Sequence, residues 1–165
     1  YYQRVAGDRT LDAIARGQKR LLLVMATGTG KTYTAFQIIY RLRKAGLGKK
    51  ILYLADRNIL VDQSIQQDFR PLAGVIHKVN YASDDRTTIT SYEVYFSLYQ
   101  QLFGENDEER FRELFRPDFF DLIVVDECHR GSAKADSRWR KILDYFNTAI
   151  QIGMTATPKE TAYLS

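Results

Sequence analysis

The chain has 165 residues, enough for one α/β domain with a sizeable core. Hydrophobic residues make up 45% of it and charged residues 27%, an ordinary balance for a globular domain, and its apolar runs are too short to span a bilayer. The net charge of +4 and pI near 9.1 are compatible with a polyanionic partner. A single cysteine, Cys128, excludes an internal disulfide, and no secretory pattern opens the chain. We therefore expect a cytoplasmic protein without a membrane partner.

Short apolar segments alternate with helical patterns along the chain, as expected of parallel βαβ units. The strands predicted in chain order are 20–26, 51–55, 75–79, 94–98, 122–125 and 149–154. The helices predicted between them are 31–45, 58–69, 107–115 and 139–146. Polar surface loops are expected at 82–88 and 104–109. The β-branched run in 122–125 is typical of a strand at the centre of a parallel sheet.

Four aromatic residues lie in or beside the strand at 94–98, namely Tyr92, Tyr95, Phe96 and Tyr99. Aromatic side chains stack on the bases of single-stranded nucleic acid, so a binding role is one interpretation. Their position in a strand favours the other, which is packing in the core.

A glycine-rich loop stands between the first strand and the next helix, and it consists of Ala26-Thr27-Gly28-Thr29-Gly30-Lys31-Thr32. Its two glycines let the backbone bend so that successive N–H groups point at phosphate oxygens, and the helix that follows adds its positive N-terminal dipole. Lys31 is expected to reach the β- and γ-phosphates of ATP, and Thr32 to offer a hydroxyl to Mg²⁺. Met25 occupies the first glycine position of the usual P-loop pattern, while the glycines nearest the lysine are present.

Two adjacent carboxylates end the hydrophobic strand at 122–125. In P-loop enzymes an aspartate at such a position holds Mg²⁺, which we assign to Asp126. Side chains alternate along a strand, so Glu127 points elsewhere and is free to act as the general base on the attacking water. With Lys31, these two residues form the expected catalytic set.

Several segments carry a family resemblance. Asp126-Glu127-Cys128-His129 resembles the DExH box of superfamily 2 helicases and translocases, and Gly153–Pro158 resembles their TATP motif. Finer features are similar to the motor (R) subunit of type I restriction endonucleases, with type III restriction subunits next; these are 54–63, 96–100 and 126–132. The match covers nearly the whole chain, and the motifs occur in the order of the family.

The resemblance implies further site residues. Gln3 is similar to the glutamine that reads adenine, and His129 stands where the family couples ATP chemistry to DNA contacts. Arg57 and Asn58 follow a strand end on the expected DNA-facing edge, where a generic surface role is the alternative. Thr155 and Thr157 follow the last strand. We expect them to couple the state of the bound nucleotide to the strength of DNA binding; the alternative is that they only form the turn by which the chain leaves the strand.

We accordingly expect a RecA-like P-loop NTPase domain over 1–165, a three-layer α/β/α sandwich with a mostly parallel sheet. The chain begins at Tyr1 rather than methionine, which suggests a segment of a larger enzyme. The resemblance implies Mg²⁺-dependent ATP hydrolysis that drives translocation on double-stranded DNA, within a type I site-specific deoxyribonuclease. It also implies a nuclease domain, a second RecA-like domain with an arginine finger, and modification and specificity subunits. The isolated segment should be a poor ATPase.

Other classes of function remain open at this point. A P-loop small-molecule kinase would not need a TATP motif after a DExH box, and a non-catalytic nucleotide-gated module would be expected to lack Glu127. Within the motor class, a repair or RNA helicase is the main alternative.

Overall fold

The computed structural model describes residues 2–25, 31–55, 70–87, 89–126 and 133–156. Its strands are β1 (Arg20–Met25), β2 (Ile51–Ala55), β3 (Ile76–Lys78), β4 (Val94–Leu98), β5 (Leu122–Asp126) and β6 (Ile150–Ala156). Its α-helices are α1 (Tyr2–Ala15), α2 (Lys31–Lys44), α4 (Phe111–Leu114) and α5 (Ala133–Tyr145). Short 3₁₀ turns lie at Arg70–Val75, Ile89–Ser91, Tyr99–Leu102 and Glu105–Asp107.

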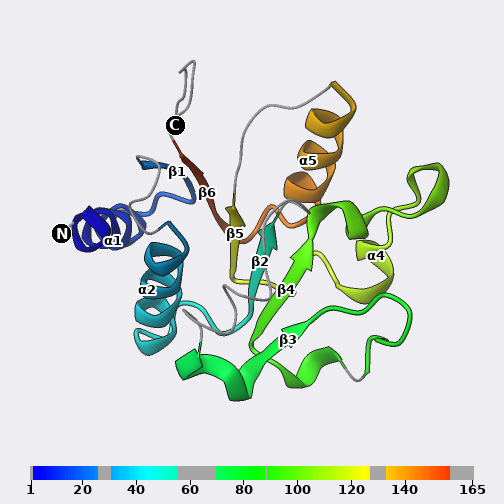
Figure 1. Ribbon diagram of the computed structural model, residues 1–165, viewed down its shortest axis with the longest axis horizontal. Coiled ribbons are helices and arrows are strands. Elements are labelled where there is room, and N and C mark those ends of the chain that lie inside the picture. The colour runs from blue at the N-terminus through cyan, green and yellow to red at the C-terminus, as the bar shows by residue number, and fades with distance from the viewer. Residues whose placement is uncertain (1, 26–30, 56–69, 88, 127–132, 157–165) are drawn as a thin grey trace.

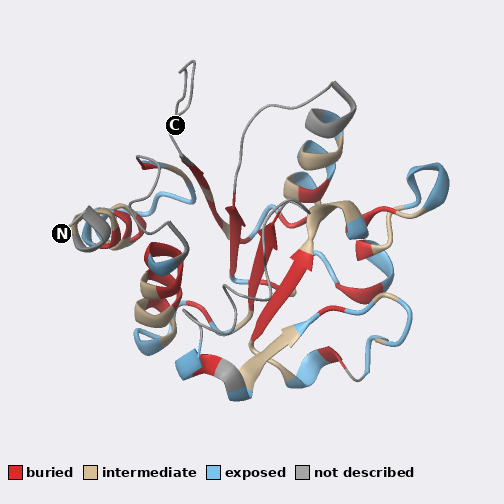
Figure 2. Ribbon diagram, viewed as in Figure 1, coloured by how far each residue is buried: buried red, intermediate tan, exposed pale blue. Residues whose placement is uncertain are grey.

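The strands form one six-stranded sheet in the order β1-β6-β5-β2-β4-β3, and every pairing among the described residues is parallel. All the strands therefore end at the same edge (Figure 1). β5 lies inside the sheet between β6 and β2, and all five of its residues are buried (Figure 2). This confirms an α/β fold with a parallel sheet and a central strand at 122–125.

Alternation along the strands divides the core between the two faces of the sheet. One face packs against α1 and α2, and its buried strand residues are Met25, Tyr53, Ala55, Phe96, Val124, Ile152 and Met154, among others. The other face packs against α4 and α5, and its strand residues include Leu52, Leu54, Tyr95, Ile123 and Val125. Figure 1 shows these helices on opposite sides of the sheet, so the three-layer sandwich is confirmed.

The end of α2 follows from its sequence. Gly46 has φ of 75°, a left-handed conformation that suits glycine just beyond a helix. Its N–H donates to the carbonyl of Arg43 at 3.0 Å, and the N–H of Leu47 donates to the carbonyl of Leu42 at 2.9 Å. This pair of bonds is the Schellman motif, which satisfies carbonyls that the helix leaves open. Arg43 and Lys44 in the last turn complement the negative end of the helix dipole.

The predicted strands and the helix at 31–45 are confirmed, with ends that differ by at most two residues. The predicted helix at 139–146 is part of α5, which begins six positions earlier, at Ala133. The helix α1 was not predicted, and the helix predicted at 58–69 lies outside the described residues.

The prediction of an acidic helix over 107–115 was wrong in its first half. Only Phe111–Leu114 is α-helical. Asn106 and Asp107 have positive φ of 56° and 58°, a conformation that Asn and Asp tolerate but an α-helix excludes. The N–H of Gly104 bonds to the carbonyl of Glu108 at 2.6 Å, which closes an exposed loop instead.

The aromatic residues around β4 pack within the protein. Tyr95 and Phe96 are fully buried on opposite faces of the sheet. Burial raises the pKa of the Tyr95 hydroxyl to about 12, and this hydroxyl donates to the carbonyl of Tyr92 at 2.9 Å. Tyr99 stacks on Trp139 of α5 with ring centroids 4.4 Å apart. The core-packing interpretation is therefore the correct one for Tyr95 and Phe96.

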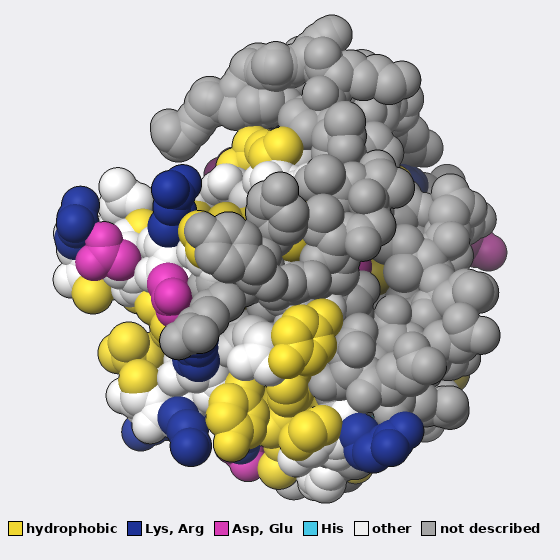
Figure 3. Space-filling view, turned by 60° about the vertical axis from the view of Figure 1, so that its left-hand side comes forward, with side chains coloured by type: hydrophobic (Ala, Val, Ile, Leu, Met, Phe, Trp, Pro, Cys, Tyr) yellow, Lys and Arg dark blue, Asp and Glu magenta, His cyan; other side chains and the backbone are white. Residues whose placement is uncertain are grey.

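Charged side chains on the surface do not gather by sign in the view of Figure 3. Lysine and arginine side chains lie at separate positions around hydrophobic ones, with acidic residues between them, over the part of this face that belongs to described residues. Among these residues no helix is long and apolar enough to cross a membrane.

Candidate nucleotide and magnesium site

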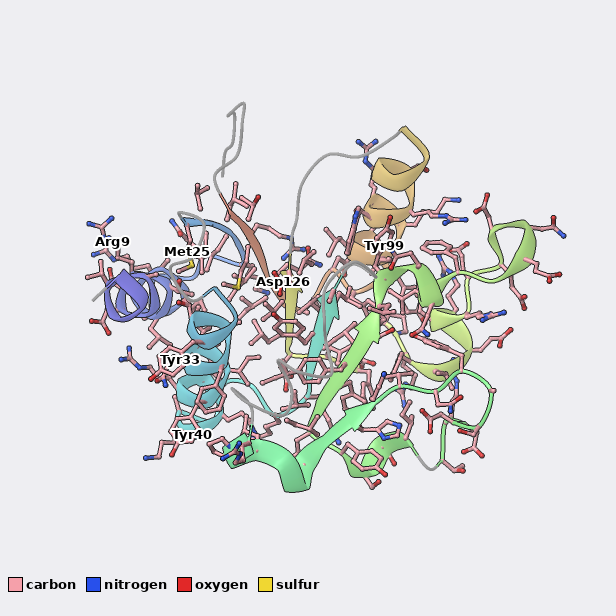
Figure 4. The ribbon with its side chains drawn as sticks, viewed as in Figure 1. Arg9, Met25, Tyr33, Tyr40, Tyr99 and Asp126 are labelled. Carbon is pink, nitrogen blue, oxygen red and sulfur yellow. The ribbon has the colours of Figure 1, made fainter. Side chains whose placement is uncertain are left out.

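The carboxyl edge of the sheet brings the two chemical motifs together. β1 ends at Met25, directly before the glycine-rich loop, and α2 begins at Lys31, within the last two residues of that loop. β5 ends at Asp126, the first residue of the DExH box. Figure 4 places Met25 and Asp126 at this same edge. Ligands of open α/β sheets bind at the carboxyl ends of the strands, so this edge is the candidate site.

The register of the strands sets the distance between the motifs. β6 separates β1 from β5, and it pairs with Met25 at Ala156 and with Asp126 at Met154. Because neighbouring strands lie about 4.8 Å apart, Met25 and Asp126 are roughly 10 Å apart across the sheet and two residues, about 6.6 Å, apart along it. Nucleotide phosphates held by the loop, with a Mg²⁺ bound between Thr32 and Asp126, would fit a separation of this size.

Within the candidate catalytic set, Asp126 has a side chain whose burial and contacts the structure describes. It is only 1% exposed, at the end of a fully buried strand. Its Oδ2 accepts a hydrogen bond of 2.5 Å from the hydroxyl of Tyr53 in β2. Burying a carboxylate lowers the stability of the fold unless the group is hydrogen-bonded, paired or bound to a metal. The position of Asp126 at the carboxyl edge therefore favours a functional role over a packing role.

Magnesium fits the donors present at this edge. Mg²⁺ prefers oxygen ligands and is usually held by one or two carboxylates together with substrate phosphates and water, rather than by a cage of protein side chains. The described residues contain no group of three His, Cys, Asp or Glu side chains that could hold a metal on their own. A buried aspartate at the sheet edge where the strand before the glycine-rich loop also ends fits the way P-loop NTPases hold Mg²⁺.

The other predicted residues differ in how far they can be placed. Lys31 and Thr32 are the first two residues of α2, and Gln3 lies in the first turn of α1; nothing further is described for their side chains. The remaining ones lie outside the described residues, and they are Thr27, Gly28, Thr29, Gly30, Arg57, Asn58, Glu127, His129 and Thr157.

Thr155 lies at the carboxyl edge as expected, but on the other side of the sheet from Asp126. It is 4% exposed and pairs in register with Val24 of β1. Its neighbour Met154 belongs to the α2 face, as do Tyr53 and Val124, so alternation turns Thr155 toward the α5 face. Any relay through Thr155 therefore runs on the side of the sheet opposite the Asp126 carboxylate.

Tyr53 was not recognised from the sequence. The available signal was its position as the single hydroxyl-bearing residue in the strand Ile51–Ala55, which is otherwise aliphatic. The hydroxyl of a buried tyrosine usually has a hydrogen-bond partner, so a partner is expected for Tyr53. Its partner lies on another strand, 73 positions away, and strand order is needed to find it.

The family of the chain follows from comparison with known proteins. Residues 1–160 match the family model described as "Type III restriction enzyme, res subunit". The chain belongs to this family. The restriction-enzyme membership agrees with the resemblance of the DExH box and its neighbours.

Individual members of the restriction-enzyme group give the same result. The chain is 58% identical over 166 aligned residues to the type I restriction enzyme EcoAI endonuclease subunit of Escherichia coli, covering 100% of this chain and 20% of that subunit. It is 33% identical over 178 aligned residues to the EcoKI endonuclease subunit of E. coli strain K12, covering 96% of this chain and 15% of that protein. The chain thus spans about a fifth or less of the length of these relatives.

A solved structure supports the fold assignment. A nuclease-deletion mutant of the type ISP restriction-modification enzyme LlaGI, in complex with a DNA substrate mimic, matches with a TM-score of 0.67 and 26% identity. The alignment covers 100% of this chain and 18% of LlaGI. The fold is accordingly that of a RecA-like helicase domain, and the chain is a domain of the restriction-enzyme family.

Proposed function

We propose that this domain binds and hydrolyses ATP with Mg²⁺ and that the cycle drives translocation along double-stranded DNA in a type I restriction endonuclease. The observation that carries the proposal is the buried Asp126 carboxylate at the end of β5, at the same sheet edge where β1 leads into the glycine-rich loop. Membership of the restriction-enzyme family supports it. The roles of individual residues are proposals on the same basis.

ATP binding is assigned to the loop and the helix that follows it. The backbone N–H groups of the loop, from Thr27 to Gly30, would surround the phosphates, and Lys31 at the start of α2 would add a positive charge at the β- and γ-phosphates. Gln3 would read the adenine from α1. Thr32 and Asp126 would hold Mg²⁺, which neutralises charge that develops on the phosphates when it is bound.

Hydrolysis and coupling are assigned to the residues beyond the strand ends. Glu127 would accept a proton from the attacking water. His129, Thr155 and Thr157 would transmit the nucleotide state to the DNA-binding surface, to which Arg57 and Asn58 would contribute. The structure of LlaGI in complex with a DNA substrate mimic supports DNA as the track.

The same family membership supports a set of partners. We propose that the domain, over 1–165, works beside a second RecA-like domain and a nuclease domain of the same protein, with modification and specificity subunits, in the cytoplasm. An arginine from the second domain would complete the site, and such a residue contributes about 10³–10⁵ in rate. The isolated domain should therefore hydrolyse ATP slowly.

The test uses the full-length protein assembled with its subunits. ATP hydrolysis is measured with Mg²⁺, with and without duplex DNA that carries the recognition site, and translocation is followed by displacement of a triplex-forming strand. We expect DNA-stimulated hydrolysis, and displacement whose delay grows with distance from the site. ATP hydrolysis that duplex DNA does not stimulate would refute the motor assignment.

A further inference from the structure

Tyr53 is placed by the sheet to reach Asp126. β2 and β5 are parallel neighbours, and Tyr53 stands opposite Val124 in their register. Asp126 lies two positions further along β5, on the same face of the sheet. Two residues of strand advance the chain by about 6.6 Å, a span that a tyrosine side chain crosses and a serine or threonine side chain does not. The Tyr53 hydroxyl therefore lies beside the Asp126 carboxylate.

The contact is buried and the tyrosine ring is held. Tyr53 is 2% exposed and Asp126 is 1% exposed, and the hydroxyl donates to Oδ2 at 2.5 Å. The ring of Phe96, which pairs with Tyr53 from β4, packs against it with centroids 4.9 Å apart. The donor is therefore aimed by packing on a strand, not by a flexible loop, as pre-organised sites require.

The hydrogen bond acts on a group whose orientation matters. An ionised carboxylate has about four lone-pair sites on two oxygens, and the phenolic donor occupies one of them. A donor fixed on Oδ2 restricts rotation of the carboxylate and so fixes the direction that the other sites face. Hydrogen bonds to charged acceptors are also stronger than neutral ones, which makes this restriction effective.

We propose that Tyr53 is a positioning residue: its hydroxyl holds the Asp126 carboxylate in the orientation that receives the Mg²⁺ of the ATP complex. The proposal rests on the function proposed above, since Asp126 must serve the metal for its orientation to matter. Outer-shell partners of metal-binding carboxylates typically contribute about 10- to 100-fold to metal affinity or activity. We expect an effect of this size from Tyr53.

The test compares two tyrosine-to-phenylalanine variants of the full-length protein. Tyr53→Phe removes the hydroxyl and keeps the ring against Phe96. Tyr95→Phe is the matched control, because it removes a buried hydroxyl from the adjacent strand on the opposite face. Mn²⁺ binding is titrated by electron paramagnetic resonance with a non-hydrolysable ATP analogue present, and nucleotide binding is measured separately in EDTA. Circular dichroism and thermal unfolding are recorded for both variants, and the titrations are run below the lower melting temperature.

We expect Tyr53→Phe to weaken Mn²⁺ binding about 10- to 100-fold while nucleotide binding in EDTA stays at the parental value. The control should keep parental Mn²⁺ affinity even if it lowers the melting temperature. Equal Mn²⁺ affinity in the two variants would overturn the role of Tyr53.

A second set of variants tests the role of Tyr53 separately from the proposed role of Asp126 in Mg²⁺ binding. Asp126→Asn alone should weaken Mn²⁺ binding, and adding Tyr53→Phe to it should have little further effect, because the tyrosine acts through the carboxylate. If Asp126→Asn weakens Mn²⁺ binding and Tyr53→Phe does not, only the role of Tyr53 fails. Parental Mn²⁺ affinity in Asp126→Asn would refute the metal role of Asp126 itself, and with it both proposals. Equal effects of Tyr53→Phe in the presence and absence of the Asp126 carboxylate would likewise overturn positioning.

Discussion

The two ends of β5 carry the same residue type in different surroundings. Asp121 stands directly before the strand and is exposed, and its Oδ2 accepts hydrogen bonds from the backbone N–H groups of Lys49 and Lys50 at 2.9 and 3.0 Å. Asp126 ends the strand, is buried, and accepts from the side chain of Tyr53. Five positions along the chain therefore separate Asp121, which is hydrogen-bonded to backbone N–H groups, from Asp126 at the carboxyl edge of the sheet.

The difference shows that the role of an aspartate depends on the edge of the parallel sheet at which it lies. At the amino edge, Asp121 joins the turn before β2 to the start of β5, so its partners are backbone groups and its role is structural. At the carboxyl edge, the last side chains of the strands lie where ligands of open α/β sheets bind. A buried charge there is a cost to the fold, and we attribute its presence to the nucleotide complex that it would serve.

The largest effect is expected just beyond the carboxyl end of β5. Glu127→Gln in the full-length protein keeps the shape of the side chain but removes its ability to accept a proton. Losing a general base typically costs about 10²–10⁴ in rate, so steady-state turnover should fall by this factor while ATP affinity stays near the parental value. Glu105→Gln, an exposed residue away from the site, is the control. Turnover at the parental rate in Glu127→Gln would exclude it as the base.

An intermediate effect is expected on the α5 face of the same edge. Thr155→Ala with Thr157→Ala should leave ATP binding nearly intact, while DNA-stimulated hydrolysis and triplex displacement fall together or lose their fixed ratio. Thr10→Ala serves as a control for loss of a buried threonine hydroxyl, since the Thr10 hydroxyl donates to the carbonyl of Ala6 at 2.8 Å inside α1. If the double variant translocates at the parental speed per ATP consumed, the two threonines are structural.

The smallest effect is expected at the amino end of β5. Asp121→Ala removes an exposed acceptor of two backbone hydrogen bonds, for which we expect a loss of about 1 kcal/mol after allowing for solvent. Differential scanning fluorimetry should show a melting temperature lower by about 2–4 °C. ATP turnover per folded molecule should be parental. A large loss of turnover here would mean that the two ends of the strand are not distinct in function.

Much of the fold could be read from the sequence because its strands are continuous apolar runs. The central strand at 122–125 and the helix after the glycine-rich loop were predicted on such patterns. The helix α1 was missed because Gly7 and Thr10 occupy part of its buried face, beside Leu11 and Ile14, which pack in the core. Small and polar residues at such positions weaken the hydrophobic periodicity that marks a helix.

The candidate site was predictable in its motifs and not in its cross-strand contacts. The position of Asp126 at a strand end followed from local pattern alone. The Tyr53 contact depends on β2 lying beside β5, although the two strands are far apart along the chain. The opposite facing of Thr155 and Asp126 likewise depends on the register between β5 and β6, which local sequence does not specify.

Calorimetric titration of ATP into two lysine variants of the full-length protein shows whether a Mg²⁺–ATP site lies at the carboxyl edge of the sheet. Lys31→Ala removes the charge at the first residue of α2, and Lys44→Ala removes an exposed lysine at the last residue of the same helix. We expect Lys31→Ala to weaken ATP binding sharply with an unchanged circular dichroism spectrum, and Lys44→Ala to bind ATP as the parent does. Parental ATP affinity in folded Lys31→Ala would contradict the account.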